Sequence, residues 1–231
     1  MTKLHYFRGR GRAETTRWML AVNQIPFENI VIDTPEELVA LRATGKLPFD
    51  QMPLLEIDGL NLSQSSAMIR YLARRGGFYG DTDTDALWCD LIAGAVADFA
   101  ETGLKATFQR TDEIAISGQQ ASFAKFAPRF EARLKENGTG FYAGTRLSFA
   151  DVILAEALSL YLEWIPDILE ATPLLKALNE TVLSQPGIKA YLASDLRYTK
   201  PGNTYVIDVA RVLQRALPPH FPDPDQFVAP S

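Results

Sequence analysis

The sequence contains little of the two residues that most often bind transition metals: it has one cysteine, Cys89, and two histidines among 231 residues. A single cysteine excludes an intramolecular disulfide and fits a reducing compartment. Because Cys89 lies in an apolar helical stretch, we interpret it as a buried, inert thiol rather than a nucleophile. With so few histidine and cysteine side chains, we expect no metal site.

The chain also lacks an excess of positive charge and any long apolar run. Its net charge is −5, so bulk charge does not favour binding to nucleic acid. No apolar run approaches the roughly 18 residues that a membrane span needs. The N-terminus shows no apolar core of the kind found in signal peptides. We therefore expect a cytoplasmic protein that has neither a membrane nor a nucleic acid as partner.

Residues 1–78 alternate between strand and helix patterns and predict an α/β domain of order β-α-β-α-β-β-α. Thr34 and Glu37 have the spacing of a helix capping box. The dipeptide Asp58-Gly59 predicts a tight hairpin between the last two strands. We expect strands at residues 3–7, 27–32, 53–57 and 60–62, and helices at residues 12–23, 35–43 and 64–74.

Beyond a linker at residues 79–85, no convincing strand pattern follows, so residues 86–231 predict an all-helical second domain. Ser148 and Asp151 have capping-box spacing and begin a segment that is apolar on every side, which belongs at the centre of a helical domain. The proline-rich end of the chain cannot continue a helix. We expect helices at residues 86–108, 121–137, 148–163, 173–184, 188–192 and 205–217.

The sequence indicates a candidate reactive site where the first strand ends. Tyr6 lies at the end of that strand. The arginine- and glycine-rich segment RGRGRAE, which contains Arg12, follows the strand directly and opens a helix. A helix N-terminus and arginines beside a phenolic hydroxyl can stabilise an anion, which we interpret as a thiolate. On spacing alone Tyr6 is equally well a core aromatic. For Arg12 a solvated surface charge is the less favoured alternative. We expect Arg8 and Arg10 to lie at the surface or to support the site indirectly.

Two segments, LHYFRGRGRAETTRWMLA and FDQMPLLEIDGLNLSQSSAMIRYLA, resemble the cytosolic glutathione transferases, most closely the alpha class. The resemblance is dense over the first domain and weaker afterwards. It implies a thioredoxin-like N-terminal domain that binds glutathione, an all-helical C-terminal domain with the electrophile pocket, and a homodimer. The activity implied is conjugation of the glutathione thiolate to hydrophobic electrophiles, with glutathione as co-substrate and no metal or redox cofactor.

The resemblance also assigns roles to individual residues. Tyr6 stabilises the thiolate with help from Arg12, and a cis bond at Met52-Pro53 lets the Met52 backbone pair with the tripeptide. Phe49 enters the neighbouring subunit. The residues expected to bind glutathione are Arg42, Gln51, Met52, Pro53, Gln64, Ser65 and, across the dimer, Asp98. The electrophile pocket is expected to include Phe7, Gly11 and Leu104, with side chains from the last helix such as Val206 and Val209.

Several of these residues have plainer interpretations. Ser65 can simply cap its helix, Arg42 can be a solvated charge, and Pro53 can be an ordinary trans proline at a strand edge. Ser66 stands where alpha relatives often carry arginine, and Ala13 replaces a bulkier residue, so dimer contacts and substrate range stay open. Two other functions stay open as well: a glutathione-dependent isomerase or peroxidase on the same site, and a non-catalytic ligand-binding relative.

Overall fold

The computed structural model describes residues 1–109, 111–217 and 221. Its N-terminal part is built on a four-stranded sheet of order β2-β1-β3-β4, in which β1 and β2 are parallel and the other neighbours antiparallel. This mixed sheet confirms the predicted thioredoxin-like fold. The strands are β1 (Thr2–Tyr6), β2 (Phe27–Val31), β3 (Leu54–Ile57) and β4 (Leu60–Ser63).

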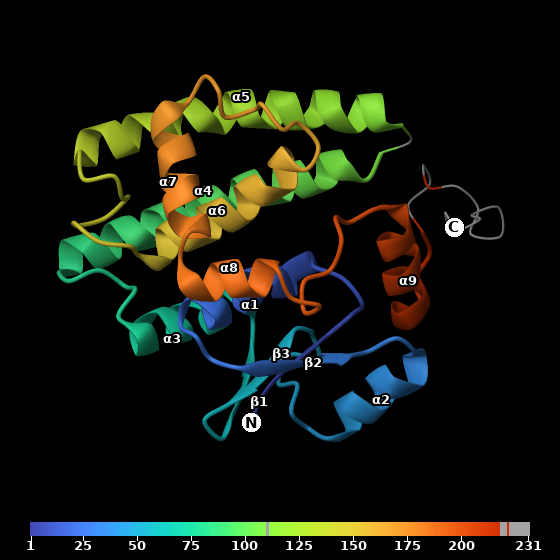
Figure 1. Cartoon of the computed structure of the whole chain (residues 1–231). Helices are drawn as coiled ribbons and strands as arrows, with labels where there is room; N and C mark the ends of the chain where they lie inside the picture. Colours follow the sequence, from blue (N-terminus) through green and yellow to red (C-terminus); the bar gives the residue numbers. More distant parts are fainter. Residues whose placement is uncertain (110, 218–220, 222–231) are drawn as a thin grey trace.

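Helices cover both faces of this sheet. α1 and α3 lie on the side that faces the helical part of the molecule, and α2 lies on the opposite side (Figure 1). The predicted capping box of α2 is confirmed: the Glu37 N–H donates to Thr34 Oγ1, and the Thr34 N–H donates to the Glu37 carboxylate, both at 3.2 Å. The elements are the 3-10 turn η1 (Gly11–Ala13), α1 (Glu14–Val22), α2 (Pro35–Ala43) and α3 (Ser65–Gly76).

The second part of the described chain is helical, as predicted, but several bounds differ from the sequence pattern. α4 begins at Asp83 rather than at residue 86, because the Thr82 hydroxyl accepts from the Asp85 N–H and extends the helix. α9 ends at Leu213 rather than at residue 217, and most of the proline-rich tail lies outside the described residues. The helices are α4 (Asp83–Thr107), α5 (Asp112–Asn137), α6 (Phe149–Leu162), α7 (Pro173–Leu183), α8 (Pro186–Leu192) and α9 (Asn203–Leu213).

The largest difference concerns α5, whose first residue is Asp112 and not residue 121. The helix is capped by Thr111, whose hydroxyl accepts from the Ile114 N–H at 3.4 Å. Gly118 lies against α4, where an added Cβ would come 3.0 Å from Ala106. Glycine weakens a helix intrinsically, so close packing between α4 and α5 outweighs propensity in this stretch.

α6 forms the centre of the helical part and packs against α1, α4 and α7. The Asp151 carboxylate accepts hydrogen bonds from the Ser148 N–H (2.7 Å), the Ser148 hydroxyl (2.6 Å) and the Tyr142 N–H (2.9 Å). The Phe149 N–H donates to the Phe78 carbonyl at 2.7 Å, which ties the start of α6 to the end of the N-terminal part. The prediction of a buried, capped central helix is confirmed.

Cys89 is fully buried, and burial raises the pKa of its thiol to about 11, which agrees with an inert thiol. Over the residues that the structure describes, none of the helices combines the length and the apolar character needed to cross a bilayer.

The Asp151 carboxylate gives a test of the fold. Replacing Asp151 with alanine leaves two buried backbone N–H groups without their acceptor, so the free energy of unfolding should fall by about 3 kcal/mol. Urea unfolding followed by circular dichroism measures this change. The matched control is Asp112→Ala in the exposed first turn of α5, which should cost less than about 1 kcal/mol. Equal losses in the two variants would contradict the role given to Asp151.

Candidate active site

The site is built around the hydroxyl of Tyr6, the last residue of β1. The Tyr6 side chain is buried, and its Oη accepts a hydrogen bond from the Arg12 backbone N–H at 3.0 Å. Gly11 makes this approach possible. Its φ is +43°, and a Cβ there would lie 2.5 Å from Tyr6 Oη. A side chain at position 11 is therefore excluded by both conformation and space.

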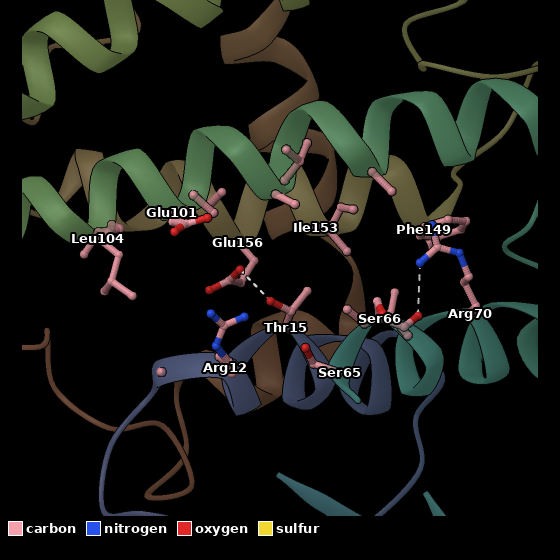
Figure 2. Close-up of a pocket in the computed structure, with 18 residues that line it drawn as sticks. Arg12, Thr15, Ser65, Ser66, Arg70, Glu101, Leu104, Phe149, Ile153 and Glu156 are labelled. Atoms are coloured by element: carbon pink, nitrogen blue, oxygen red, sulfur yellow. Dashed lines mark hydrogen bonds between the residues drawn. The ribbon is translucent and has the colours of Figure 1, made fainter. Parts of the chain in front are cut away.

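Arg12 lies in η1, at the N-terminal end of α1, and its side chain is exposed. It points into a cavity of about 280 Å³ that lies between α1 and α3 on one side and α4 and α6 on the other. Figure 2 shows the guanidinium directed toward Glu156 of α6. The walls from α4 and α6 are largely apolar, and Gly11, Ser65 and Leu104 also line the cavity. Apolar walls with a few polar groups are typical of a small-molecule site.

The other arginines of the glycine-rich run support the structure. Arg10 is buried and donates to both carboxylate oxygens of Glu163, at 2.7 and 2.9 Å, and to the Tyr198 carbonyl at 2.8 Å. Arg8 is exposed and pairs with Asp33. This division agrees with the expectation that Arg12 is the arginine of the run that faces the site.

The start of α3 holds two of the residues expected to bind glutathione. Gln64 is the N-cap residue with a φ of +66°, an uncommon conformation for a residue other than glycine. Its side-chain amide donates to Gln51 Oε1 at 3.0 Å. Ser65 is the first residue of the helix and lines the cavity. The Ala67 N–H donates to the Gln64 carbonyl at 2.9 Å, whereas Ser65 and Ser66 come too early in the helix to donate to a carbonyl of an earlier turn, so this end can accept a carboxylate.

The remaining expected residues lie on different parts of the fold. The Met52–Pro53 bond is cis, as the resemblance implies. Arg42, in the last turn of α2, pairs with Asp50 through Nε at 2.7 Å. Asp98 lies on the exposed side of α4. The described cavity lining includes neither Arg42 nor Asp98, so their contacts with glutathione stay predictions.

Only some of the residues predicted for the electrophile pocket line the cavity. Gly11 and Leu104 line the cavity with Arg12. Phe7 is buried next to Tyr6, with the two ring centroids 5.1 Å apart, and it is absent from the described lining. Its role in the pocket stays a prediction. Among the described residues no group of three or more His, Cys, Asp or Glu is placed to hold a metal ion.

Sequence reasoning missed two residues beside the site. Tyr205 of α9 brings its hydroxyl to 3.3 Å from Tyr6 Oη, whereas the residues named from the last helix were Val206 and Val209. Glu156 of α6 faces the cavity, where its carboxylate accepts from the Thr15 hydroxyl at 2.9 Å. Burial, together with the nearby Glu14, raises the pKa of Glu156 to about 8. The available signal for this second residue was a glutamate in the almost entirely apolar segment that follows Asp151.

Comparison with known proteins gives two family matches. Residues 2–74 match the model of the glutathione S-transferase N-terminal domain, and residues 98–195 match that of the glutathione S-transferase C-terminal domain. Glutathione S-transferase alpha M14 of Sus scrofa is 35% identical over 95% of this chain and 97% of its own length. Glutathione S-transferase alpha-3 of Rattus norvegicus is 38% identical over 82% of this chain and 87% of its own length.

Solved structures give the same result. NaGST-2 superposes with a TM-score of 0.75 at 30% identity, covering 87% of this chain and 98% of its own. Na-GST-3 of Necator americanus, described as monomeric, has the same TM-score and identity over 87% of this chain and 99% of its own. Prostaglandin synthase D of Nilaparvata lugens superposes with a TM-score of 0.70 at 29% identity, covering 84% of this chain and 98% of its own.

Glu156 makes a prediction about stability and pH. Its pKa is raised from 4.5 to about 8 in the folded protein, so the folded state keeps a proton that the unfolded state releases. The contribution of Glu156 to stability should therefore fall as the pH rises between about 4.5 and 8. Glu156→Gln removes this penalty, and the variant should gain stability over the parent at pH 8 but not near pH 5.

Urea unfolding of both proteins at the two pH values measures this difference. The control is Glu101→Gln, an exposed glutamate at the same cavity, which should show no such pH-dependent gain. A Glu156→Gln variant whose stability relative to the parent is identical at both pH values would contradict the prediction.

Proposed function

This chain belongs to the glutathione S-transferase family, and from this premise we propose that Tyr6, assisted by Arg12, stabilises the glutathione thiolate for attack on hydrophobic electrophiles. The family relationship makes the protein a transferase that conjugates glutathione. The assignment of the thiolate to Tyr6 is the part that needs an experiment. It is carried by one observation, the hydrogen bond from the Arg12 N–H to the Tyr6 hydroxyl.

That hydrogen bond decides what the phenol can do. A tyrosine hydroxyl has one hydrogen to donate and lone pairs that accept. Because Arg12 already donates to Tyr6 Oη, one lone pair of the oxygen is engaged. The hydroxyl hydrogen is left for an acceptor in the site. A thiolate is the acceptor that glutathione brings.

The energy required is within reach of these groups. A cysteine-type thiol has a pKa of about 8.5, so only a few per cent is ionised at neutral pH. Lowering that pKa by about two units needs about 2.7 kcal/mol of preferential stabilisation of the anion. A charge-assisted hydrogen bond from Tyr6 supplies energy of this order. The Arg12 charge and the N-terminal end of α1 add to it.

The two acidic ends of the tripeptide would lie farther along the same domain. We assign the γ-glutamyl carboxylate to the N-terminal end of α3, where Gln64 and Ser65 begin the helix and Gln51 lies in hydrogen-bond contact with Gln64. The glycyl carboxylate would bind Arg42, which already pairs with Asp50. The Arg42 guanidinium would then contact both carboxylates. Met52, just before β3, would pair with the peptide backbone of glutathione.

We propose a homodimer in which Phe49 inserts into the partner and Asp98 reaches the partner's glutathione. The support is exposure: the Phe49 side chain is 63% exposed in the turn after α2, and Leu87 and Leu91 are exposed along α4. Large apolar side chains that are left exposed favour burial against another surface. One solved relative is described as monomeric, so the assembly needs its own test. A cytoplasmic location likewise stays a proposal.

The direct test of the catalytic assignment is Tyr6→Phe, which removes the donated hydrogen bond and keeps the ring. Turnover in glutathione conjugation to a generic aryl halide should fall by at least about tenfold at neutral pH. The pKa of bound glutathione, followed by the ultraviolet absorbance of its thiolate, should rise by about one unit or more. Glutathione affinity should be largely kept.

Three other outcomes are informative. Equal rates and equal thiolate pKa values in the parent and the variant would remove Tyr6 from the mechanism. A parent protein that binds no glutathione would favour a non-catalytic relative. A parent that binds glutathione but leaves the aryl halide unreacted would favour an isomerase or peroxidase on the same thiolate.

The dimer is tested by Phe49→Ser, which replaces the exposed ring by a polar group. Analytical ultracentrifugation should show a dimer for the parent and a shift toward monomer for the variant. Val39→Ser on α2 is the matched control, since Val39 is 61% exposed and has no proposed partner; its assembly should equal that of the parent. A monomeric parent, or an unchanged dimer in Phe49→Ser, would refute the proposed role of Phe49.

A further inference from the structure

Tyr205 of α9 contacts the same hydroxyl as Arg12 does. Its Oη lies 3.3 Å from Tyr6 Oη, a contact between residues at opposite ends of the chain. The ring lies directly over the glycine turn, where a Cβ at Gly9 would come 2.5 Å from Tyr205 Cδ2. The ring also stacks on Phe108, with centroids 6.3 Å apart and planes 23° apart. Glycine at positions 9 and 11 therefore leaves room for the Tyr205 ring as well as for the Tyr6 hydroxyl.

The direction of the bond between the two phenols depends on what Tyr6 does with its own hydrogen. Either hydroxyl can be the donor when the site is empty. If Tyr6 donates its hydrogen to a bound sulfur, only Tyr205 has a hydrogen left for the contact between them. Tyr6 Oη would then accept two hydrogen bonds, one from the Arg12 N–H and one from the Tyr205 hydroxyl.

We propose that Tyr205 is a positioning residue for the conjugation reaction, whose hydroxyl donates to Tyr6 Oη while Tyr6 donates to the glutathione sulfur. This inference rests on the proposed role of Tyr6 as the donor to the thiolate. Hydrogen bonds in a chain polarise one another, so a donor behind Tyr6 makes the Tyr6 hydroxyl a stronger donor in front. Tyr205 would stabilise the thiolate without touching it.

The surroundings of Tyr205 suit a donor. Burial and the neighbouring Tyr6 raise the pKa of the Tyr205 hydroxyl, which keeps it protonated through the physiological range. The charged groups that act on it are Arg17 and Arg12, both cations. The contact between the two phenols is part-buried, and a hydrogen bond has more effect in such a site than at an exposed surface.

A double-mutant cycle tests the relay on the intact protein with glutathione bound. The four proteins are the parent, Tyr205→Phe, Tyr6→Phe and the double variant, and the quantity measured is the pKa of bound glutathione from its thiolate absorbance. Tyr205→Phe keeps the stacked ring and removes only the hydroxyl. It should raise the thiolate pKa by about half a unit when Tyr6 is present and leave it unchanged when position 6 is phenylalanine.

Two further measurements keep the test decisive. Placing 3-fluorotyrosine at position 205, whose more acidic hydroxyl is a stronger donor, should lower the thiolate pKa. Tyr71→Phe, which removes an exposed hydroxyl bound to Asp58, should leave it unchanged.

An unchanged or lowered thiolate pKa in Tyr205→Phe would overturn the relay, and so would an equal rise in both backgrounds. A loss of turnover with an unmoved thiolate pKa would also overturn it, because the hydroxyl would then act elsewhere. These failures differ from failure of the proposed function, which would appear as a Tyr6→Phe variant whose thiolate pKa equals that of the parent.

Discussion

The hydrogen bond from the Arg12 N–H to Tyr6 Oη is the interaction on which the site depends. It joins the last residue of β1 to the turn before α1, and it engages one lone pair of a buried phenol. Gly11 is what allows the turn to approach so closely, since a side chain there would collide with the phenol. The same turn places the Arg12 side chain toward the cavity between the two parts of the molecule (Figure 2). Backbone geometry and site chemistry are thus set by one short segment.

That segment is fixed in turn by buried ionic contacts. The Glu14 carboxylate, at the start of α1, accepts from Arg17 at 3.0 Å, from the Trp18 indole at 3.2 Å and from the Tyr191 hydroxyl of α8 at 2.9 Å. Arg10 reaches the other way and pairs with Glu163 at the end of α6. Breaking a buried pair by removing one partner is costly. The turn that carries Arg12 is therefore held between the sheet and the helical domain, which limits its freedom to move.

Much of this could be predicted from the sequence because its signals are local. The strand-helix order, the hairpin at Asp58-Gly59 and the buried start of α6 follow from spacing within short windows, and the structure confirms them. The start of α5 and the position of Tyr205 could not be predicted in this way. The first depends on packing against α4, and the second is a contact across nearly the whole chain. Neither leaves a periodic pattern in the sequence.

The central claim is that the phenol of Tyr6 donates to the sulfur of bound glutathione. A crystal structure of the protein with glutathione tests it most directly. The account predicts the sulfur within hydrogen-bond distance of Tyr6 Oη, with the Arg12 N–H still donating to that oxygen. A sulfur that points away from Tyr6, or a glutathione bound elsewhere because this pocket is blocked, would contradict it.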